Sequence, residues 1–152
     1  MKIKLDKKQI LEYQQNRDPY LLIDEATEVI PGKSAKGFKI LNKDEWFFEV
    51  HWPSDPNMPG MLQVESMVQM CALAILTLPN NKGKIVYLTS ANNLKFAKKI
   101  LPETKLEIIT EIKSFKRGVA ICKGEGFIKN ELACKAEFNL VLPGEIRKYS
   151  LK

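Results

Sequence analysis

The sequence predicts an α+β domain in which a curved antiparallel sheet wraps around one long central helix. Residues 59–78 are apolar on nearly every side, as in a helix that is buried all round. The segments after this helix alternate apolar and polar residues with a period of two, and turn residues separate them, as in half-buried strands. One buried helix followed by a run of hairpins indicates a sheet folded around that helix.

Capping and turn residues set the order of the other elements. Asp6 can cap a short helix over residues 7–15, and Asp18-Pro19 then ends it. Turn signals at Pro31-Gly32, at 116–118 and at 129–130 fall where hairpin loops belong, so neighbouring strands are expected to be antiparallel. The expected strands cover residues 26–30, 33–40, 46–50, 84–96, 105–114, 119–128 and 131–142.

Length and composition favour a single domain over residues 1–152, with a core at about 5–142 and a short C-terminal tail. An open sheet leaves unpaired edges, and joining two of them across a two-fold axis would form a homodimer. No run approaches the roughly 18 apolar residues of a membrane span. The N-terminus also lacks the apolar segment of a signal peptide, so we expect a cytoplasmic protein.

A formal charge of +6 is compatible with nucleic-acid binding, but the lysines are scattered over amphipathic segments and form no basic arm. Nucleic-acid binding is therefore disfavoured. Cys71, Cys122 and Cys134 are odd in number and too far apart for a CxxC motif. They fit small buried residues in a reducing compartment, and we expect no disulfide, no metal and no cofactor.

The only histidine, His51, opens a loop that contains three prolines and ends at Gly60, directly before the long helix. Histidine normally titrates near neutral pH, so His51 is the obvious candidate for a general base. When His51 is considered alone, a histidine that only caps a helix or packs in the core is at least as good an interpretation as a catalytic one. The rigid loop and the expected position at the end of a strand favour the catalytic one.

Glu65 stands inside the apolar helix, where a leucine is expected. A carboxylate buried there must be paired, hydrogen-bonded or protonated. Gln69 lies four residues on, on the same helical face, and can orient it. A glutamate that only faces solvent near the helix start is the alternative.

Gly60 stands where the first amides of the long helix have no partner within the helix and carry partial positive charge. Without a Cβ, it lets a substrate carbonyl approach the backbone, as an oxyanion-type site requires, although an ordinary helix start also explains it. A base, an acid and a polarising amide together suit the removal of water from a 3-hydroxyacyl thioester, with no cofactor.

These residues resemble the FabZ-type 3-hydroxyacyl-acyl-carrier-protein dehydratases of the hotdog superfamily. The similar segments are residues 16–24, the His-x-Pro-x-x-Pro-x-Met-Pro-Gly loop of 51–60, and 65–69, within a resemblance over about 5–142. It implies a hotdog fold and homodimers with two shared active sites, commonly as a trimer of dimers. It also implies His51 of one protomer as the base, Glu65 of the other as the acid, the Gly60 amide on the thioester carbonyl, Gln69 as support, and Tyr87 as a gate of the acyl tunnel.

Several positions depart from the family's usual residues. Asn16 replaces a histidine, Val50 the glycine before the catalytic histidine, and Asn92 an aspartate. Lys99 replaces a proline and Glu103-Thr104 a Gly-Asp turn, so a differently shaped loop is expected after the strand over 84–96.

The expected reaction is dehydration of 3-hydroxyacyl groups, carried on acyl carrier protein, to trans-2-enoyl thioesters in fatty-acid or related acyl-chain biosynthesis. Two other functions stay open: a hotdog thioesterase, which the histidine loop disfavours, and a non-catalytic acyl-binding subunit, which Val50 and Asn16 favour. The family's carrier protein is acidic, and basic residues are candidates for its docking surface. They are Lys95, Lys98, Lys99, Lys116 and Arg117.

Overall fold

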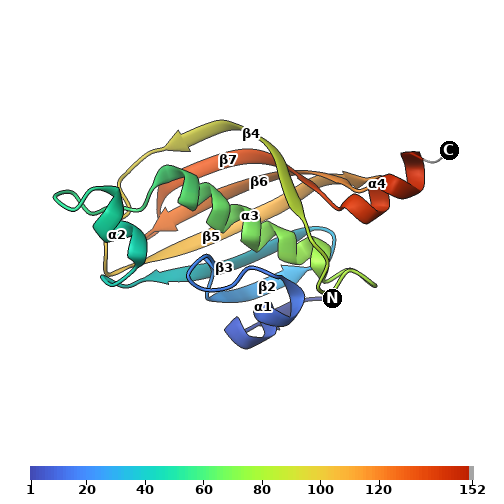
Figure 1. The fold of residues 1–152 in the computed structure, drawn as a ribbon, viewed down its shortest axis with the longest axis horizontal. Helices are drawn as coiled ribbons and strands as arrows, with labels where there is room; N and C mark the ends of the chain where they lie inside the picture. Colours follow the sequence, from blue (N-terminus) through green and yellow to red (C-terminus); the bar gives the residue numbers. More distant parts are fainter. Residues whose placement is uncertain (151–152) are drawn as a thin grey trace.

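A seven-stranded antiparallel sheet curves around helix α3 in the computed structural model, in the order β1-β2-β3-β5-β6-β7-β4 (Figure 1). The structure describes residues 1–150, with side chains as far as residue 146; residues 151 and 152 of the predicted tail lie outside the described residues. The strands are β1 (Ile3–Leu5), β2 (Glu25–Ile30), β3 (Ser34–Leu41), β4 (Tyr87–Phe96), β5 (Thr104–Lys116), β6 (Val119–Ile128) and β7 (Glu131–Val141). The helices are α1 (Lys7–Tyr13), α2 (Trp46–His51), α3 (Gly60–Leu76) and α4 (Pro143–Ser150).

The core lies between α3 and the concave face of the sheet. Met67 and Met70 of α3 are fully buried there, and each packs against a glycine of the sheet. A Cβ on Gly37 would lie 2.5 Å from Met70 Cε, and one on Gly124 would lie 3.0 Å from Met67 Cβ. The two glycines therefore let the helix approach the sheet closely, which confirms the predicted arrangement of a sheet around a buried helix.

The predicted cap at Asp6 and the predicted hairpin turns are confirmed, but the helix expected over residues 7–15 ends at Tyr13, before it reaches Asp18-Pro19. Asp6 forms a capping box with Gln9 at the start of α1. Arg117 and Gly118 join β5 to β6, and Lys129-Asn130 joins β6 to β7; each pair has positive φ at both positions. Two-residue loops of this kind match the twist of antiparallel strands, so the hairpins follow one another as expected.

The prediction of a strand over residues 46–50 is wrong, because Trp46–His51 form the helix α2. Phe47 and Phe48 are both buried, which a strand with only one face in the core does not allow. Periodicity cannot separate a helix from a strand over so short an apolar run, and here tertiary packing decides. His51 therefore ends a helix rather than a strand.

Two short elements at the ends of the chain were not predicted. Strand β1 pairs with β2 and is too short for its alternation to be recognised, and α4 forms the start of the predicted tail. The expected strand over 84–96 begins only at Tyr87. Among the described helices, none combines the length and the apolar character needed to span a membrane.

Candidate active site

The imidazole of His51 is oriented by two neighbours in the loop that follows α2. Its Nδ1 lies 3.2 Å from the carbonyl oxygen of Asn57, and its ring stacks on Trp52 with centroids 4.4 Å apart. When Nδ1 carries the proton and donates it to Asn57, Nε2 is left as the acceptor. This is the tautomer that a general base requires.

The loop between α2 and α3 is held at several points. The Met58 amide donates to the Ile100 carbonyl at 2.8 Å, and Gln63 Nε2 donates to the Met58 carbonyl at 2.9 Å. Lys99 forms an ion pair with Asp55 at 2.8 Å. The loop is thus tied both to α3 and to the segment after β4, which fixes the position of His51.

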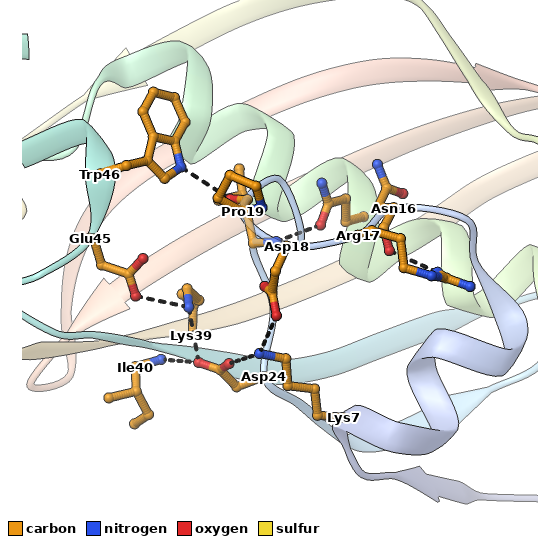
Figure 2. A network of polar contacts seen from close by, with 12 residues as sticks. Lys7, Asn16, Arg17, Asp18, Pro19, Asp24, Lys39, Ile40, Glu45 and Trp46 are labelled. Carbon is orange, nitrogen blue, oxygen red and sulfur yellow. Dashed lines mark hydrogen bonds and ion pairs between the residues drawn. The ribbon is translucent and has the colours of Figure 1, made fainter. Parts of the chain in front are cut away.

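Helix α2 is itself attached to the sheet through its first residues, as Figure 2 shows. The buried ammonium of Lys39 on β3 lies 3.1 Å from Glu45, which precedes α2, and 3.5 Å from Asp24. Trp46 Nε1 donates to the Pro19 carbonyl at 3.1 Å. These contacts place the helix that carries His51 over the end of the sheet.

An open cavity of about 560 Å³ lies beside His51 and the start of α3. The backbone amides of Gly60 and Met61 have no hydrogen-bond acceptor among the described residues, so they are free to polarise a ligand oxygen. A Cβ on Gly60 would lie 2.9 Å from the Phe96 ring, so this ring already uses the space that the glycine leaves. The lining residues are His51, Trp52, Asn57, Met58, Gly60, Met61, Gln63, Phe96, Lys98 and Lys99.

Glu65 is half-buried on α3, and Gln69 holds its carboxyl group. Gln69 Nε2 donates to Glu65 Oε1 at 3.0 Å and to the Tyr20 carbonyl at 2.9 Å, while Gln69 Oε1 accepts from the Leu22 amide at 2.8 Å. Burial raises the pKa of Glu65 above its ordinary value, and the hydrogen bond from Gln69 offsets part of this shift. The carboxyl group therefore keeps its proton to a higher pH than an exposed glutamate does.

A single chain does not bring His51 and Glu65 together. Glu65 is absent from the residues that line the His51 cavity, and no hydrogen bond or ion pair joins the two side chains in the part of the chain that the structure describes. The chain instead presents two separate pairs, His51 with Gly60 and Glu65 with Gln69. These are the halves that the family resemblance assigns to two protomers.

Tyr87 and Asn16 lie in a different place from His51. Both line a second cavity, of about 280 Å³, near the C-terminal end of α3, so the predicted gate is remote from His51 of its own chain. Of the other family departures, Val50 is exposed on α2, and Glu103 adopts a φ of +61°. A glycine reaches that conformation without strain, and Glu103 must hold it against the clash of its Cβ.

The predicted basic docking residues fall into two groups at opposite ends of the sheet. Lys98 and Lys99 line the His51 cavity, and Lys95 lies close by on β4. Lys116 is the last of the 13 residues of β5, and Arg117 follows it; this end of the strand lies roughly 40 Å from its start, near α4 (Figure 1). The structure therefore does not bring Lys116 and Arg117 to the cavity.

Three residues that shape the His51 cavity were not predicted from the sequence. Asn57 orients the imidazole, Gln63 fixes the loop, and Phe96 covers Gly60. A glutamine in the first turns of an apolar helix was the available signal for Gln63. For Asn57 and Phe96 no pattern was available, because their roles depend on contacts made in the folded chain.

The cysteines offer no nucleophile to either cavity. All three are buried and free, and burial raises the pKa of the Cys134 thiol to about 12. A thiol with so high a pKa is inert at neutral pH. No group of three or more histidine, cysteine, aspartate or glutamate side chains within the described residues could hold a metal ion.

The architecture defines the class of protein. Structures with the same arrangement include the dehydratase heterocomplex ApeI:P from Xenorhabdus doucetiae, with a TM-score of 0.74 and 13% identity over 94% of this chain and 97% of that chain. Protein PH1136 from Pyrococcus horikoshii has a TM-score of 0.61 and 15% identity over 86% of this chain and 91% of that chain. A helix wrapped by an antiparallel sheet in this way is a hotdog fold.

The sequence comparisons give the family. The model of the FabA-like domain matches residues 15–137. The 3-hydroxyacyl-[acyl-carrier-protein] dehydratase FabZ of Clostridium novyi is 38% identical over 130 residues, 86% of this chain and 92% of the relative. The FabZ of Bacillus subtilis is 36% identical over 138 residues, 91% of this chain and 98% of the relative. The chain belongs to the FabA-like domain family.

Proposed function

We propose that the protein dehydrates 3-hydroxyacyl groups bound as thioesters to acyl carrier protein, giving trans-2-enoyl thioesters for fatty-acid or related acyl-chain biosynthesis. The observation that carries the proposal is a fixed imidazole beside the unpaired amides that open a buried helix. This pair occurs in a chain that is 38% identical to a dehydratase over most of its length.

In the proposed reaction, Nε2 of His51 takes a proton from C2 of the substrate, and the electrons of that C–H bond form the C2–C3 double bond. The Gly60 amide stabilises the negative charge that develops on the thioester oxygen. The C3–O bond breaks as the carboxylic acid of Glu65 protonates the leaving hydroxyl, which departs as water. The residues themselves perform every step, and the reaction consumes no cofactor.

Glu65 suits the role of the acid because burial raises its pKa. A protonated carboxyl group can donate to the hydroxyl, whereas a carboxylate cannot. Gln69 is the positioning residue, since its amide binds both the carboxyl group and the backbone of residues 20–22. The hydrogen bond from Gln69 Nε2 to Glu65 Oε1 supports this role.

A complete site then requires a homodimer in which His51 of one protomer meets Glu65 of the partner subunit. Strand β4 supports this, because it is an edge strand that pairs only with β7 (Figure 1). Nearly all of its ten residues are exposed. Tyr87, Leu88, Leu94 and Phe96 expose apolar surface along it. Such an edge is normally covered, and pairing two copies across a two-fold axis covers it. A further trimer of dimers and a cytoplasmic location complete the proposal.

The docking surface for the acidic carrier protein is formed by Lys98 and Lys99 at the mouth of the His51 cavity. We expect Lys98→Glu to raise the KM for carrier-bound substrate about tenfold and to leave kcat with a small thioester of the same acyl group nearly unchanged. Lys116→Glu is the matched control, because Lys116 lies at the far end of β5. Equal effects of the two variants would contradict this docking surface.

The experiment that tests the function is incubation of the protein with a 3-hydroxyacyl thioester of acyl carrier protein. We expect the enoyl absorbance to rise without release of free thiol, and His51→Ala and Glu65→Gln each to lower the rate by 10² to 10⁴-fold, as loss of a general base or acid does. Release of thiol would instead indicate a thioesterase. Neither product would indicate a non-catalytic acyl-binding subunit.

A further inference from the structure

Gln63, in the first turns of α3, carries a buried amide that is only half satisfied. The residue is 4% exposed, and its Nε2 donates to the Met58 carbonyl at 2.9 Å. Its Oε1 is sealed from solvent and has no hydrogen-bond partner among the described residues. An unpaired buried oxygen is costly, and a methionine of similar length would avoid that cost. The one hydrogen bond of this amide therefore points to a function, and it runs to the loop that follows His51.

The bond from Gln63 holds one of two consecutive peptide groups beside the imidazole. The first group joins Asn57 to Met58. Its N–H donates to the Ile100 carbonyl at 2.8 Å, and its C=O lies 3.2 Å from Nδ1 of His51. The second group follows Met58, and its C=O accepts from Gln63. Because each peptide group is planar, fixing both of them fixes the two dihedral angles of Met58 and aims the Asn57 carbonyl at the imidazole.

This stretch of backbone is closed to water. Asn57 and Met58 are both buried, so solvent does not readily replace a protein donor that is lost, and neighbouring hydrogen bonds in such surroundings strengthen one another. Without the Gln63 amide, the Met58 carbonyl keeps no donor among the described residues and turns toward another partner. That rotation passes through Met58 to the neighbouring peptide group and moves the Asn57 carbonyl away from the imidazole.

We propose that Gln63 is a positioning residue for the base: it keeps the Asn57 carbonyl in place and thereby keeps the proton of neutral His51 on Nδ1. Which ring nitrogen carries that proton is set by the hydrogen bond that the ring makes. With the proton on Nδ1, Nε2 has the lone pair that accepts the C2 proton of the substrate. Without the carbonyl, the proton moves to Nε2, where histidine in water prefers it, and the base is blocked. The kinetic consequence rests on the proposed function, whereas the tautomer can be observed without substrate.

The first test observes the tautomer directly. His51 is the only histidine of the chain, so nitrogen NMR on the isotope-labelled protein reports its two ring nitrogens without ambiguity. At a pH where the imidazole is neutral, the wild type should carry the proton mainly on Nδ1. Gln63→Met, which has a similar length but no donor, should shift the ratio of the tautomers toward Nε2–H about tenfold, the change that one hydrogen bond gives.

Gln15→Met is the matched control for the tautomer. It also removes a hydrogen bond from a glutamine Nε2 to a backbone carbonyl, that of Gly83 at 2.9 Å, but this residue lies beside the second cavity. The tautomer ratio of this variant should equal that of the wild type. Thermal unfolding of each variant checks that it is folded.

The second test uses kinetics with 3-hydroxybutyryl thioester. Gln63→Met should lower kcat about tenfold and leave KM nearly unchanged, because fewer molecules carry the reactive tautomer and those are less well aligned. Gln63→Glu can donate to the Met58 carbonyl only while its carboxyl group is protonated, a form that burial favours. Its kcat should therefore match the wild type at low pH and fall to that of Gln63→Met, or below it, as the pH rises.

The outcomes separate this inference from the proposed function. A wild-type tautomer ratio in Gln63→Met, or an equal shift in Gln15→Met, overturns the role of Gln63 whatever the activities are. If Gln63→Met does not fold, Gln63→Glu takes its place, and a tautomer ratio that stays constant while its carboxyl group ionises overturns the role. If the tautomer responds as expected and the wild type dehydrates no thioester, the proposed function fails and the positioning by Gln63 stands.

Discussion

Two groups of buried polar side chains in this protein differ in how well they are satisfied. Around Lys39, every partner is present: the ammonium contacts Asp24 and Glu45, and Asp24 also accepts from the Ile40 amide at 2.6 Å (Figure 2). On and beside α3, atoms of Gln14, Gln63 and Ser66 have no partner among the described residues.

This difference distinguishes residues that stabilise the fold from residues near the candidate site. Native proteins pair nearly all buried polar groups, so a satisfied cluster stabilises the fold and unsatisfied groups point to another purpose. The Lys39 cluster ties α2 to the sheet, whereas Gln14 and Gln63 each line a cavity. Removal of a partner from the first group should therefore destabilise the protein, and removal of the unpaired Ser66 hydroxyl from the second should not.

The largest expected effect is that of Lys39→Met. It leaves Asp24 and Glu45 without their shared cation, and breaking a buried ion pair from one side should lower the free energy of unfolding by about 3 kcal/mol. Lys36→Met on the same strand removes only an exposed pair with Glu28 and should cost less than about 1 kcal/mol. Urea unfolding measures both, and equal effects would show that the cluster has no special role.

Substitution of Ser66 should change the free energy of unfolding by an intermediate amount and in the opposite direction. Its hydroxyl is fully buried and unpaired, so Ser66→Ala should raise the free energy of unfolding by about 1 kcal/mol. The comparison is Thr110→Val, which removes a buried hydroxyl that donates to the Ala35 carbonyl at 2.8 Å and should lower it by a similar amount. Destabilisation by Ser66→Ala would mean that the hydroxyl has a partner in the assembled protein.

The smallest effect concerns the pH dependence of stability at Glu65. Because its pKa is raised in the folded state, the folded protein binds this proton more tightly than the unfolded chain does. The stability that the proton contributes is complete below the unfolded pKa and is lost as the pH rises through the folded pKa. Glu65→Gln should therefore be more stable than the wild type near neutral pH, and the difference should vanish on acidification.

Unfolding of both proteins in urea from pH 4 to pH 8 checks this. A difference that grows on acidification would show that the Glu65 carboxylate is stabilised, rather than penalised, by its surroundings.

The sequence was sufficient for the helix, the hairpins and the motif residues because local patterns encode them. Period-two alternation and turn residues predicted β5 to β7, and the proline-rich loop drew attention to His51 and Gly60. The Lys39 cluster had a weaker signal, a lysine at an inward-facing position between Gly37 and Leu41.

What could not be predicted depends on contacts between distant parts of the chain. Helix α2 forms because Glu45 and Trp46 meet Lys39 and Pro19, so its short apolar run carries no decisive period. Gln14 is buried beside a cavity that the C-terminal end of α3 and residues 84–87 also line, and no local pattern indicates that these segments meet. The proposed meeting of His51 with Glu65 involves two protomers, and no periodicity within one chain encodes it.

The most direct test of the shared site is to mix two inactive variants, His51→Ala and Glu65→Gln, and let their subunits exchange. If each site combines His51 of one protomer with Glu65 of the partner subunit, every mixed dimer carries one intact site. Half of the dimers are then mixed, and about a quarter of the wild-type dehydratase activity should return. If the two residues act within one chain, every chain lacks one of them, and an exchanged mixture with no activity would contradict the account.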